Sequence, residues 1–228
     1  KETAQALLAY QTLGRDSNSI ENYLLSQSGA STGLIWYLLI DIQNHVPSSC
    51  NIKYDNIQKT ITIGDDMRLS GDLEGSCLSI ISSGYWIQVD NSCIDKSYDI
   101  SCDKDFITTL LYQKSDSDVI FISPTTHSAP ELGTTTESIK SKCFKQGEEC
   151  EYESSLWAAI ALDEAGHDVS AYIPYLMASD DDNAKYFPSA FLYILTKGQE
   201  HYASIIEQQS SNKYWQAPST AYNRFYDT

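Results

Sequence analysis

One compact group of side chains in this chain could hold a cation: the acidic run Asp180–Asp182, followed by Asn183. Clustered carboxylate and amide oxygens are the ligands that Ca²⁺ prefers. The run is continuous, and it lies in a polar stretch between two expected helices, where acidic side chains are normally solvated. We therefore interpret it as a solvated loop, with weak calcium binding by Asp180, Asp181 and Asp182 as the alternative.

The sequence contains no spacing typical of a catalytic or zinc site. The histidines are scattered, and none is paired with a second His or a Cys at metal-ligand spacing. Gly-x-Ser-x-Gly, phosphate-loop and Gly-x-Gly-x-x-Gly motifs are missing. Ser123, His127 and Asp118 have the residue types of a catalytic triad, but types without known geometry do not make a site. We expect no catalytic residue, no cofactor and no enzymatic activity.

The six cysteines indicate disulfides. Their count is even and no Cys-x-x-Cys pair occurs, which favours disulfide bonds over a zinc site. We expect the local pairs Cys50–Cys77, Cys93–Cys102 and Cys143–Cys150; the alternative is six free thiols in a cytosolic protein. Disulfides persist in oxidising compartments, so the sequence predicts an extracellular or cell-surface protein.

The charge balance limits the possible partners. A formal charge of -16 and an isoelectric point near 4.4 disfavour nucleic acid, because phosphate binding needs clustered Lys and Arg. The longest apolar run, Leu34–Ile40, is much shorter than the roughly 18 residues of a membrane-spanning helix. We therefore expect no nucleic-acid partner and no membrane insertion.

An internal repeat organises the rest of the chain. Residues 3–27 align without a gap with residues 155–179, and each copy predicts a helix, a glycine stop and a second helix. A looser third copy covers residues 189–209. Repeated helical hairpins cannot bury their apolar faces alone. Because both chain ends fall at a repeat boundary, we expect either a fragment or a subunit that another subunit completes.

Between the first two copies the pattern changes to short β-strands. Residues 59–63 alternate as a half-buried strand does, and clusters of Asp, Asn, Gly and Ser separate the candidates. We expect strands at residues 34–42, 51–54, 57–63, 77–81, 85–89, 98–102, 106–112 and 119–122. Such a number of short strands fits a β-sandwich or an open barrel. A linker is expected at residues 124–133, followed by a short helix that starts at Thr134 and ends near Cys143.

These patterns predict an α+β fold in which a helical-hairpin repeat domain is interrupted by a β-sandwich-like insert. The first hairpin covers residues 1–32, the inserted β domain covers 33–123, and the remainder of the helical domain covers 124–228. We expect the helices before and after the insert to pack together.

The hairpins resemble the α/α toroid repeats of the terpene (squalene) cyclase and protein prenyltransferase superfamily. The resemblance lies in residues 157–162 followed by Gly166, and in a Gln-to-Trp signature that runs from Gln208 to Trp215. A glycine of the family pattern is replaced by Lys213. The resemblance implies a toroid-like fold but no activity. Neither the Asp-x-Asp-Asp run of the cyclases nor the Asp, Cys and His zinc ligands of the prenyltransferases has a counterpart.

Together these features predict a non-enzymatic extracellular structural protein, a surface or filament subunit that associates head-to-tail with itself or with another surface protein. Two unlike surfaces on one subunit build rings or open filaments. The expected interface residues are Leu7, Leu8, Trp215, Tyr222, Phe225 and Tyr226. The alternative is a secreted adhesin that binds carbohydrate or protein through its β insert. A cyclase or prenyltransferase is a third, weaker hypothesis.

Overall fold

The computed structural model describes residues 1–75, 77–210 and 214–215, and it divides the chain into two compact units. The helical unit comprises residues 1–32 together with the chain from Ser141 onward. The β unit comprises Gly33–Lys140. The end predicted for the inserted domain, residue 123, lies within a strand of the β unit.

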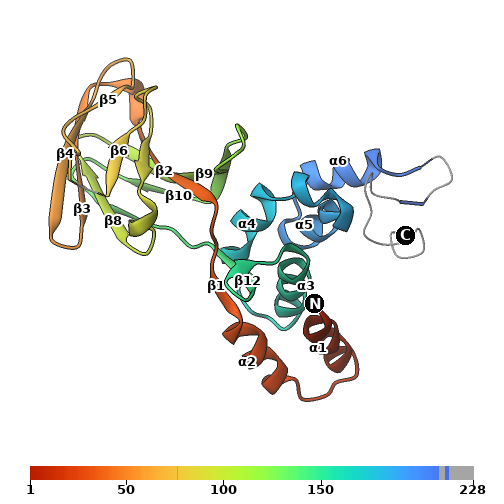
Figure 1. Cartoon of the computed structure of the whole chain (residues 1–228). Helices are drawn as coiled ribbons and strands as arrows, with labels where there is room; N and C mark the ends of the chain where they lie inside the picture. Colours follow the sequence, from red (N-terminus) through yellow and green to blue (C-terminus); the bar gives the residue numbers. More distant parts are fainter. Residues whose placement is uncertain (76, 211–213, 216–228) are drawn as a thin grey trace. The chain divides into compact units, whose positions relative to one another are not determined.

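The α-helices lie at the two ends of the chain, and the strands lie in the part of the sequence between them (Figure 1). The α-helices are α1 (Glu2–Thr12), α2 (Asn18–Ser26), α3 (Tyr152–Glu164), α4 (Ile173–Ala178), α5 (Pro188–Thr196) and α6 (Gln199–Glu207). Short 3-10 helices are η1 (Gln43–His45), η2 (Asn91–Cys93), η3 (Ser170–Tyr172) and η4 (Asp181–Tyr186). The strands are β1 (Ser28–Ala30), β2 (Leu34–Ile42), β3 (Ser48–Tyr54), β4 (Ile57–Ile63), β5 (Leu69–Ser70), β6 (Leu78–Ile80), β7 (Ile87–Val89), β8 (Ser97–Cys102), β9 (Phe106–Lys114), β10 (Phe121–Ala129), β11 (Thr135–Ser138), β12 (Lys142–Gln146) and β13 (Glu149–Cys150).

The β unit is β-sandwich-like and consists of two five-stranded antiparallel sheets. One sheet has the order β10-β9-β2-β7-β6 and the other β11-β8-β3-β4-β5. Alternate residues of β3 are buried and the residues between them are more exposed, as expected for a sheet with one solvated face. The core between the sheets contains fully buried aromatic side chains such as Tyr54, Tyr98, Phe106 and Tyr112.

Two disulfides lie in the β unit and one in the helical unit. Cys50 and Cys102 face each other directly across β3 and β8, whereas Cys77 is bonded to Cys93. The predicted pairs Cys50–Cys77 and Cys93–Cys102 are therefore wrong, because sheet pairing joins β3 to a strand distant in sequence. The third bond is Cys143–Cys150, as expected. Three disulfides indicate an oxidising environment, and no helix among the described residues is long and apolar enough to cross a membrane.

The helical unit has one core of its own. Helix α3 lies at its centre and contacts α1, α5 and strand β12. It buries seven residues, including Leu156, Ala159 and Leu162, whereas α1 buries only Ala4 and Leu7. A three-stranded sheet of order β1-β12-β13 adds Cys143 and Phe144 to the same core. The helices before and after the β unit thus pack together, with Leu7 and Leu156 in one cluster.

The expected α/α toroid is not present, and the resemblance to cyclases and prenyltransferases is wrong. Both repeat copies do form a helix that ends at a glycine in the left-handed region, Gly14 and Gly166. Stacked repeats require equivalent helices in equivalent surroundings. Here α3 is buried on most of its circumference and α1 on one narrow side, so the two copies are not equivalent. A small sheet, and not another helical hairpin, completes the core.

The linker and the short helix expected between residues 124 and 143 are also wrong. Residues 121–129 form β10 and residues 135–138 form β11, which pairs with β8. In β11, Thr135 and Glu137 are buried and Thr136 is exposed. The alternation is that of a strand, but polar residues occupy its inward positions, so the apolar period that marks most strands is missing.

Candidate functional site

The acidic run lies where α4 ends and η4 begins. Asp180 is the N-cap of η4, and the Asn183 side-chain amide donates to the Ser179 carbonyl over 2.8 Å. Burial raises the pKa of Asp180 to about 6, and the neighbouring Asp181 adds to this shift. Among the described residues, no group of three or more His, Cys, Asp or Glu side chains is arranged to hold a metal ion. The structure therefore gives no support to a calcium site in this run, and its distinctive feature is the buried, destabilised carboxylate of Asp180.

This carboxylate gives a pH-dependent stability. An unfolded Asp titrates near 3.8, so between pH 4 and 6 the folded chain holds a proton that the unfolded chain has lost. Stability should therefore fall as the pH rises through this window. We expect Asp180→Asn to remove the fall and to raise the free energy of unfolding at pH 7.5 by about 1 kcal/mol, allowing for partial solvent access. Chemical denaturation at pH 4.5 and pH 7.5 measures both effects.

Asp163→Asn is the matched control, because Asp163 is an exposed residue of α3 in the same unit. It should leave the difference between the two pH values unchanged. An Asp180→Asn protein that is no more stable than the native chain at pH 7.5 would show that Asp180 carries no burial penalty.

The residues predicted to form the assembly interface occupy different environments. Leu7 is fully buried in the helical core and is not available to a second chain, and Leu8 is partly buried against the same core. The Trp215 indole donates to the Ile205 carbonyl over 2.7 Å, so it packs against its own α6. Tyr222, Phe225 and Tyr226 lie outside the described residues.

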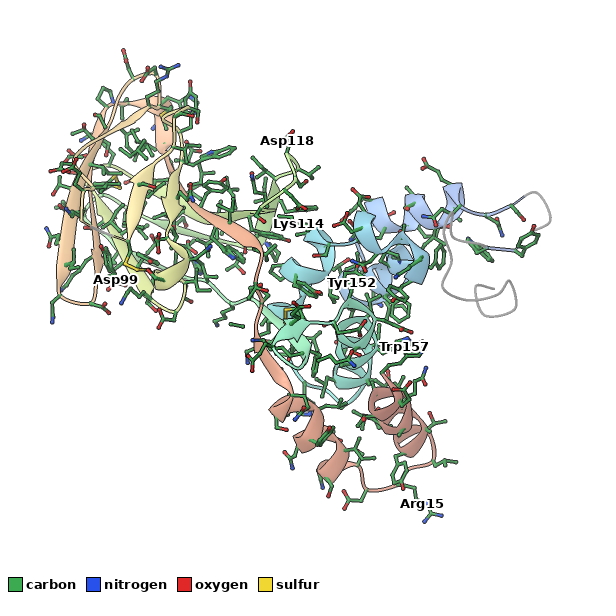
Figure 2. All side chains as sticks on the ribbon, in the orientation of Figure 1. Arg15, Asp99, Lys114, Asp118, Tyr152 and Trp157 are labelled. Carbon is green, nitrogen blue, oxygen red and sulfur yellow. A yellow bond between two sulfur atoms is a disulfide. The ribbon has the colours of Figure 1, made fainter. Side chains whose placement is uncertain are left out.

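Several groups of apolar side chains are exposed, among them Ile194, Tyr202 and Ile206 of α5 and α6 and the following two groups, one on each unit. The first group, here called the hairpin patch, consists of Val119 and Ile120 in the β9–β10 connection and Ile122 in β10. Their exposed fractions are 52%, 37% and 67%. The end of this hairpin, where Lys114 and Asp118 lie, projects from the two sheets (Figure 2). The second, here called the helical patch, consists of Tyr10, Leu13 and Tyr23 on the α1–α2 hairpin, with exposed fractions of 46%, 71% and 54%.

A polar cluster that sequence reasoning missed joins the two sheets of the β unit. The Glu137 side chain is only 3% exposed, and its Oε1 accepts from the Thr108 hydroxyl over 2.6 Å and from His127 Nδ1 over 2.8 Å. The Thr108 hydroxyl also lies 2.9 Å from Thr135 Oγ1. A carboxylate has no proton to donate, so His127 is the donor in this bond, from Nδ1. The carboxylate partner of His127 is thus Glu137 and not Asp118, so the structure does not assemble a triad of Ser123, His127 and Asp118.

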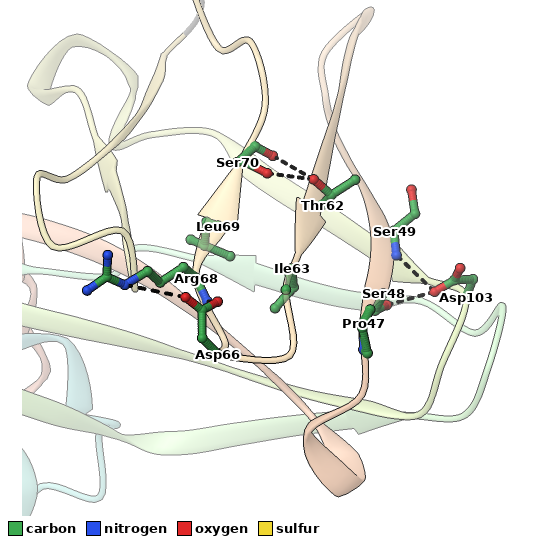
Figure 3. Close-up of a pocket in the computed structure, with 11 residues that line it drawn as sticks. Pro47, Ser48, Ser49, Thr62, Ile63, Asp66, Arg68, Leu69, Ser70 and Asp103 are labelled. Carbon is green, nitrogen blue, oxygen red and sulfur yellow. Dashed lines mark hydrogen bonds and ion pairs between the residues drawn. The ribbon is translucent and has the colours of Figure 1, made fainter.

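A surface groove of about 580 Å³ lies at one end of the sheet that contains β3, β4 and β5 (Figure 3). Buried Ile63 and Leu69 contribute to its lining, together with the polar side chains of Ser48, Thr62, Ser70, Asp66, Arg68 and Asp103. These residues come from the start of β3, the end of β4, the β4–β5 turn, β5 and the loop after β8. Small-molecule sites typically combine an apolar lining with a few placed polar groups at this volume.

Hydrogen bonds fix the polar groups of the groove. Asp103 Oδ1 accepts from the Ser48 hydroxyl over 2.7 Å and from the Ser49 backbone N–H over 2.9 Å, and these bonds hold the pKa of Asp103 below its usual value. The Arg68 guanidinium lies 3.7 Å from Asp66 Oδ2 and 5.6 Å from the centre of the Tyr85 ring. The groove thus has defined acceptors and one defined cation.

Comparison of the chain with protein-family models, with curated proteins and with solved structures finds no match.

Proposed function

We propose that this chain is a non-enzymatic extracellular structural protein that associates head-to-tail with further copies of itself. The observation that carries the proposal is the presence of two unlike exposed apolar patches, the hairpin patch on the β unit and the helical patch on the other unit. Exposed apolar groups are favourable sites of protein contact. A patch that meets a different patch makes a heterologous contact, which generates rings or open filaments.

Side chains, and not backbone pairing, are the expected means of contact at the hairpin. Strand β10 is at the edge of its sheet, but its pairing register shifts between Ile122 and Thr126, and Pro124 lies in this irregular stretch. A bulge and a proline both hinder the addition of a further strand. Ile122 nevertheless exposes two thirds of its surface, so an apolar contact is open to it.

Charge supports an association that strengthens with salt. The chain has a formal charge of -16, and each unit contains more acidic than basic residues. Like charges on two copies repel each other, and salt screens this repulsion while it leaves apolar burial intact. The disulfides support the extracellular assignment, because they indicate an oxidising environment.

Two charged substitutions test the proposal. Ile122→Asp should block the hairpin patch and Leu13→Asp the helical patch, so each variant alone should sediment as a monomer where the native chain forms larger species. In a mixture, each variant still carries one intact patch. The mixture should therefore form one-to-one dimers and nothing larger, as measured by analytical ultracentrifugation at moderate salt.

Ile57→Asp is the matched control, because Ile57 is an exposed isoleucine of the same β unit, 40% exposed, outside both patches. It should assemble as the native chain does. A native chain that stays monomeric at high concentration and high salt would contradict self-assembly and point to another surface protein as the partner. A mixture that forms no dimers would contradict the head-to-tail geometry.

A further inference from the structure

The groove at the end of the β unit has features that the assembly proposal does not use. Its residues lie apart from the hairpin patch in sequence and belong to the other sheet. Buried Ile63 and Leu69 give it an apolar part, and hydroxyl and carboxylate groups surround that part (Figure 3). A ligand that fits must combine an apolar face with hydroxyl groups around it.

Asp103 supplies a fixed acceptor. The Ser48 hydroxyl and the Ser49 backbone N–H both donate to its Oδ1. Oδ2 therefore keeps lone pairs for a donor on the ligand. The Ser48 side chain that positions this carboxylate is buried, so the acceptor is held in place before any ligand arrives. Preorganised groups lose little freedom on binding and so favour affinity.

Hydrogen-bond donors are supplied by Thr62, Ser70 and Arg68. The Thr62 and Ser70 hydroxyls lie 2.7 Å apart on neighbouring strands, and each can both donate and accept. The Arg68 side chain is 62% exposed, so its remaining N–H groups are open to a ligand. Beside it, the half-exposed Tyr85 ring offers an apolar face of the kind that packs against C–H groups.

The charges in the groove narrow the class of ligand. The groove contains two carboxylates, Asp66 and Asp103, and one guanidinium, Arg68, in a chain of formal charge -16. Phosphate, sulfate and carboxylate ligands would meet net repulsion here. A polyamine, which is a cation, would be repelled by the Arg68 guanidinium. Neutral ligands with several hydroxyl groups and apolar C–H faces satisfy all of these groups.

We infer that the groove binds a neutral carbohydrate, with ligand hydroxyls on Asp103 and Arg68 and its C–H face against the Tyr85 ring beside Arg68. The sugar can come from a free polysaccharide or from a glycan attached to a protein, since both present the same rings. Binding at this groove is independent of the head-to-tail contact.

Titration calorimetry of the full chain tests the inference with neutral hexasaccharides of the β-1,4-glucan, β-1,4-mannan and α-1,4-glucan types. We expect at least one to bind at millimolar or lower concentration. Asp103→Asn keeps an acceptor for Ser48 and Ser49 but loses the charge of the second oxygen, and should weaken binding at least tenfold. Arg68→Gln, at an exposed position, should do the same.

Asp55→Asn is the matched control, because Asp55 lies in the β3–β4 turn at the opposite end of these strands and pairs with Lys96. It should bind as the native chain does. A glycoprotein with mannose-rich glycans, assayed before and after glycan removal, separates the two sources of sugar. Failure of every neutral sugar to bind, or binding of spermidine or a sulfated oligosaccharide in its place, would overturn the inference.

Discussion

Loss of the Cys50–Cys102 disulfide should destabilise the β unit more than any other removal of a disulfide in this chain. The bond closes a loop of 52 residues, against 16 for Cys77–Cys93 and 7 for Cys143–Cys150. A cross-link stabilises chiefly by restricting the unfolded chain, and the effect grows with loop length. On this basis the three bonds contribute about 4, 3 and 2 kcal/mol respectively.

The measurement is chemical denaturation of the three double Cys→Ala variants. Trp36 is buried in the β unit and Trp157 lies in the helical unit, so single-tryptophan versions report the two transitions separately. The variant C143A/C150A serves as the control for the β unit, because its bond belongs to the helical unit. Equal losses for the Cys50–Cys102 and Cys77–Cys93 pairs would contradict the loop-length argument.

Substitution of His127 should lower the free energy of unfolding more than substitution of its carboxylate partner, Glu137. His127→Ala removes one of the two donors described above for Glu137, leaving the Thr108 hydroxyl to compensate a carboxylate inside the sandwich. An inadequately compensated buried carboxylate is strongly destabilising. We expect a loss of about 3 kcal/mol in the free energy of unfolding. Glu137→Leu leaves Thr108 beside Thr135 and His127 half exposed to water, so the loss should be about 1 kcal/mol.

The double variant separates this explanation from a simple loss of packing. With Glu137→Leu in place, His127→Ala no longer strands a carboxylate, so the double variant should be more stable than His127→Ala alone. Non-additivity of this kind is the signature of residues that act as one network. His45→Asn, at an exposed position of the same unit, is the control and should cost little. Additive losses would show that His127 and Glu137 act independently.

The sequence determined the elements whose pattern is local. Runs rich in β-forming residues, bounded by polar clusters, predicted β2 and β4 with the bounds that the structure has, Leu34–Ile42 and Ile57–Ile63. The two glycine stops predicted the ends of the first helices of both copies, because a left-handed residue at a helix end favours glycine. The cysteine count predicted disulfides and an oxidising environment. The strands and the helix ends depend on residues within one strand or one turn, and the disulfide prediction depends only on a count.

Tertiary structure decided what depends on distant neighbours. The partner of Cys50 followed from β3 lying beside β8, which no local spacing predicts. Strand β11 was not predicted because its inward residues are polar. They can be buried only because Thr108 and His127 form hydrogen bonds with them. The toroid prediction failed for a related reason. Two similar helical hairpins in sequence became one central helix and one peripheral helix, since a small sheet shares their core.

The candidate sites show the same division. The exposed apolar residues Ile122 and Leu13 are visible in the sequence, but only burial shows that Leu7 lies inside the core while Leu13 does not. The groove brings together Ser48, Thr62, Arg68 and Asp103, which are up to 55 residues apart. None of the four is unusual in its local context. Their chemistry arises because sheet pairing places the ends of β3, β4 and β5 and the loop after β8 at one edge, and the sequence pattern does not encode that juxtaposition locally.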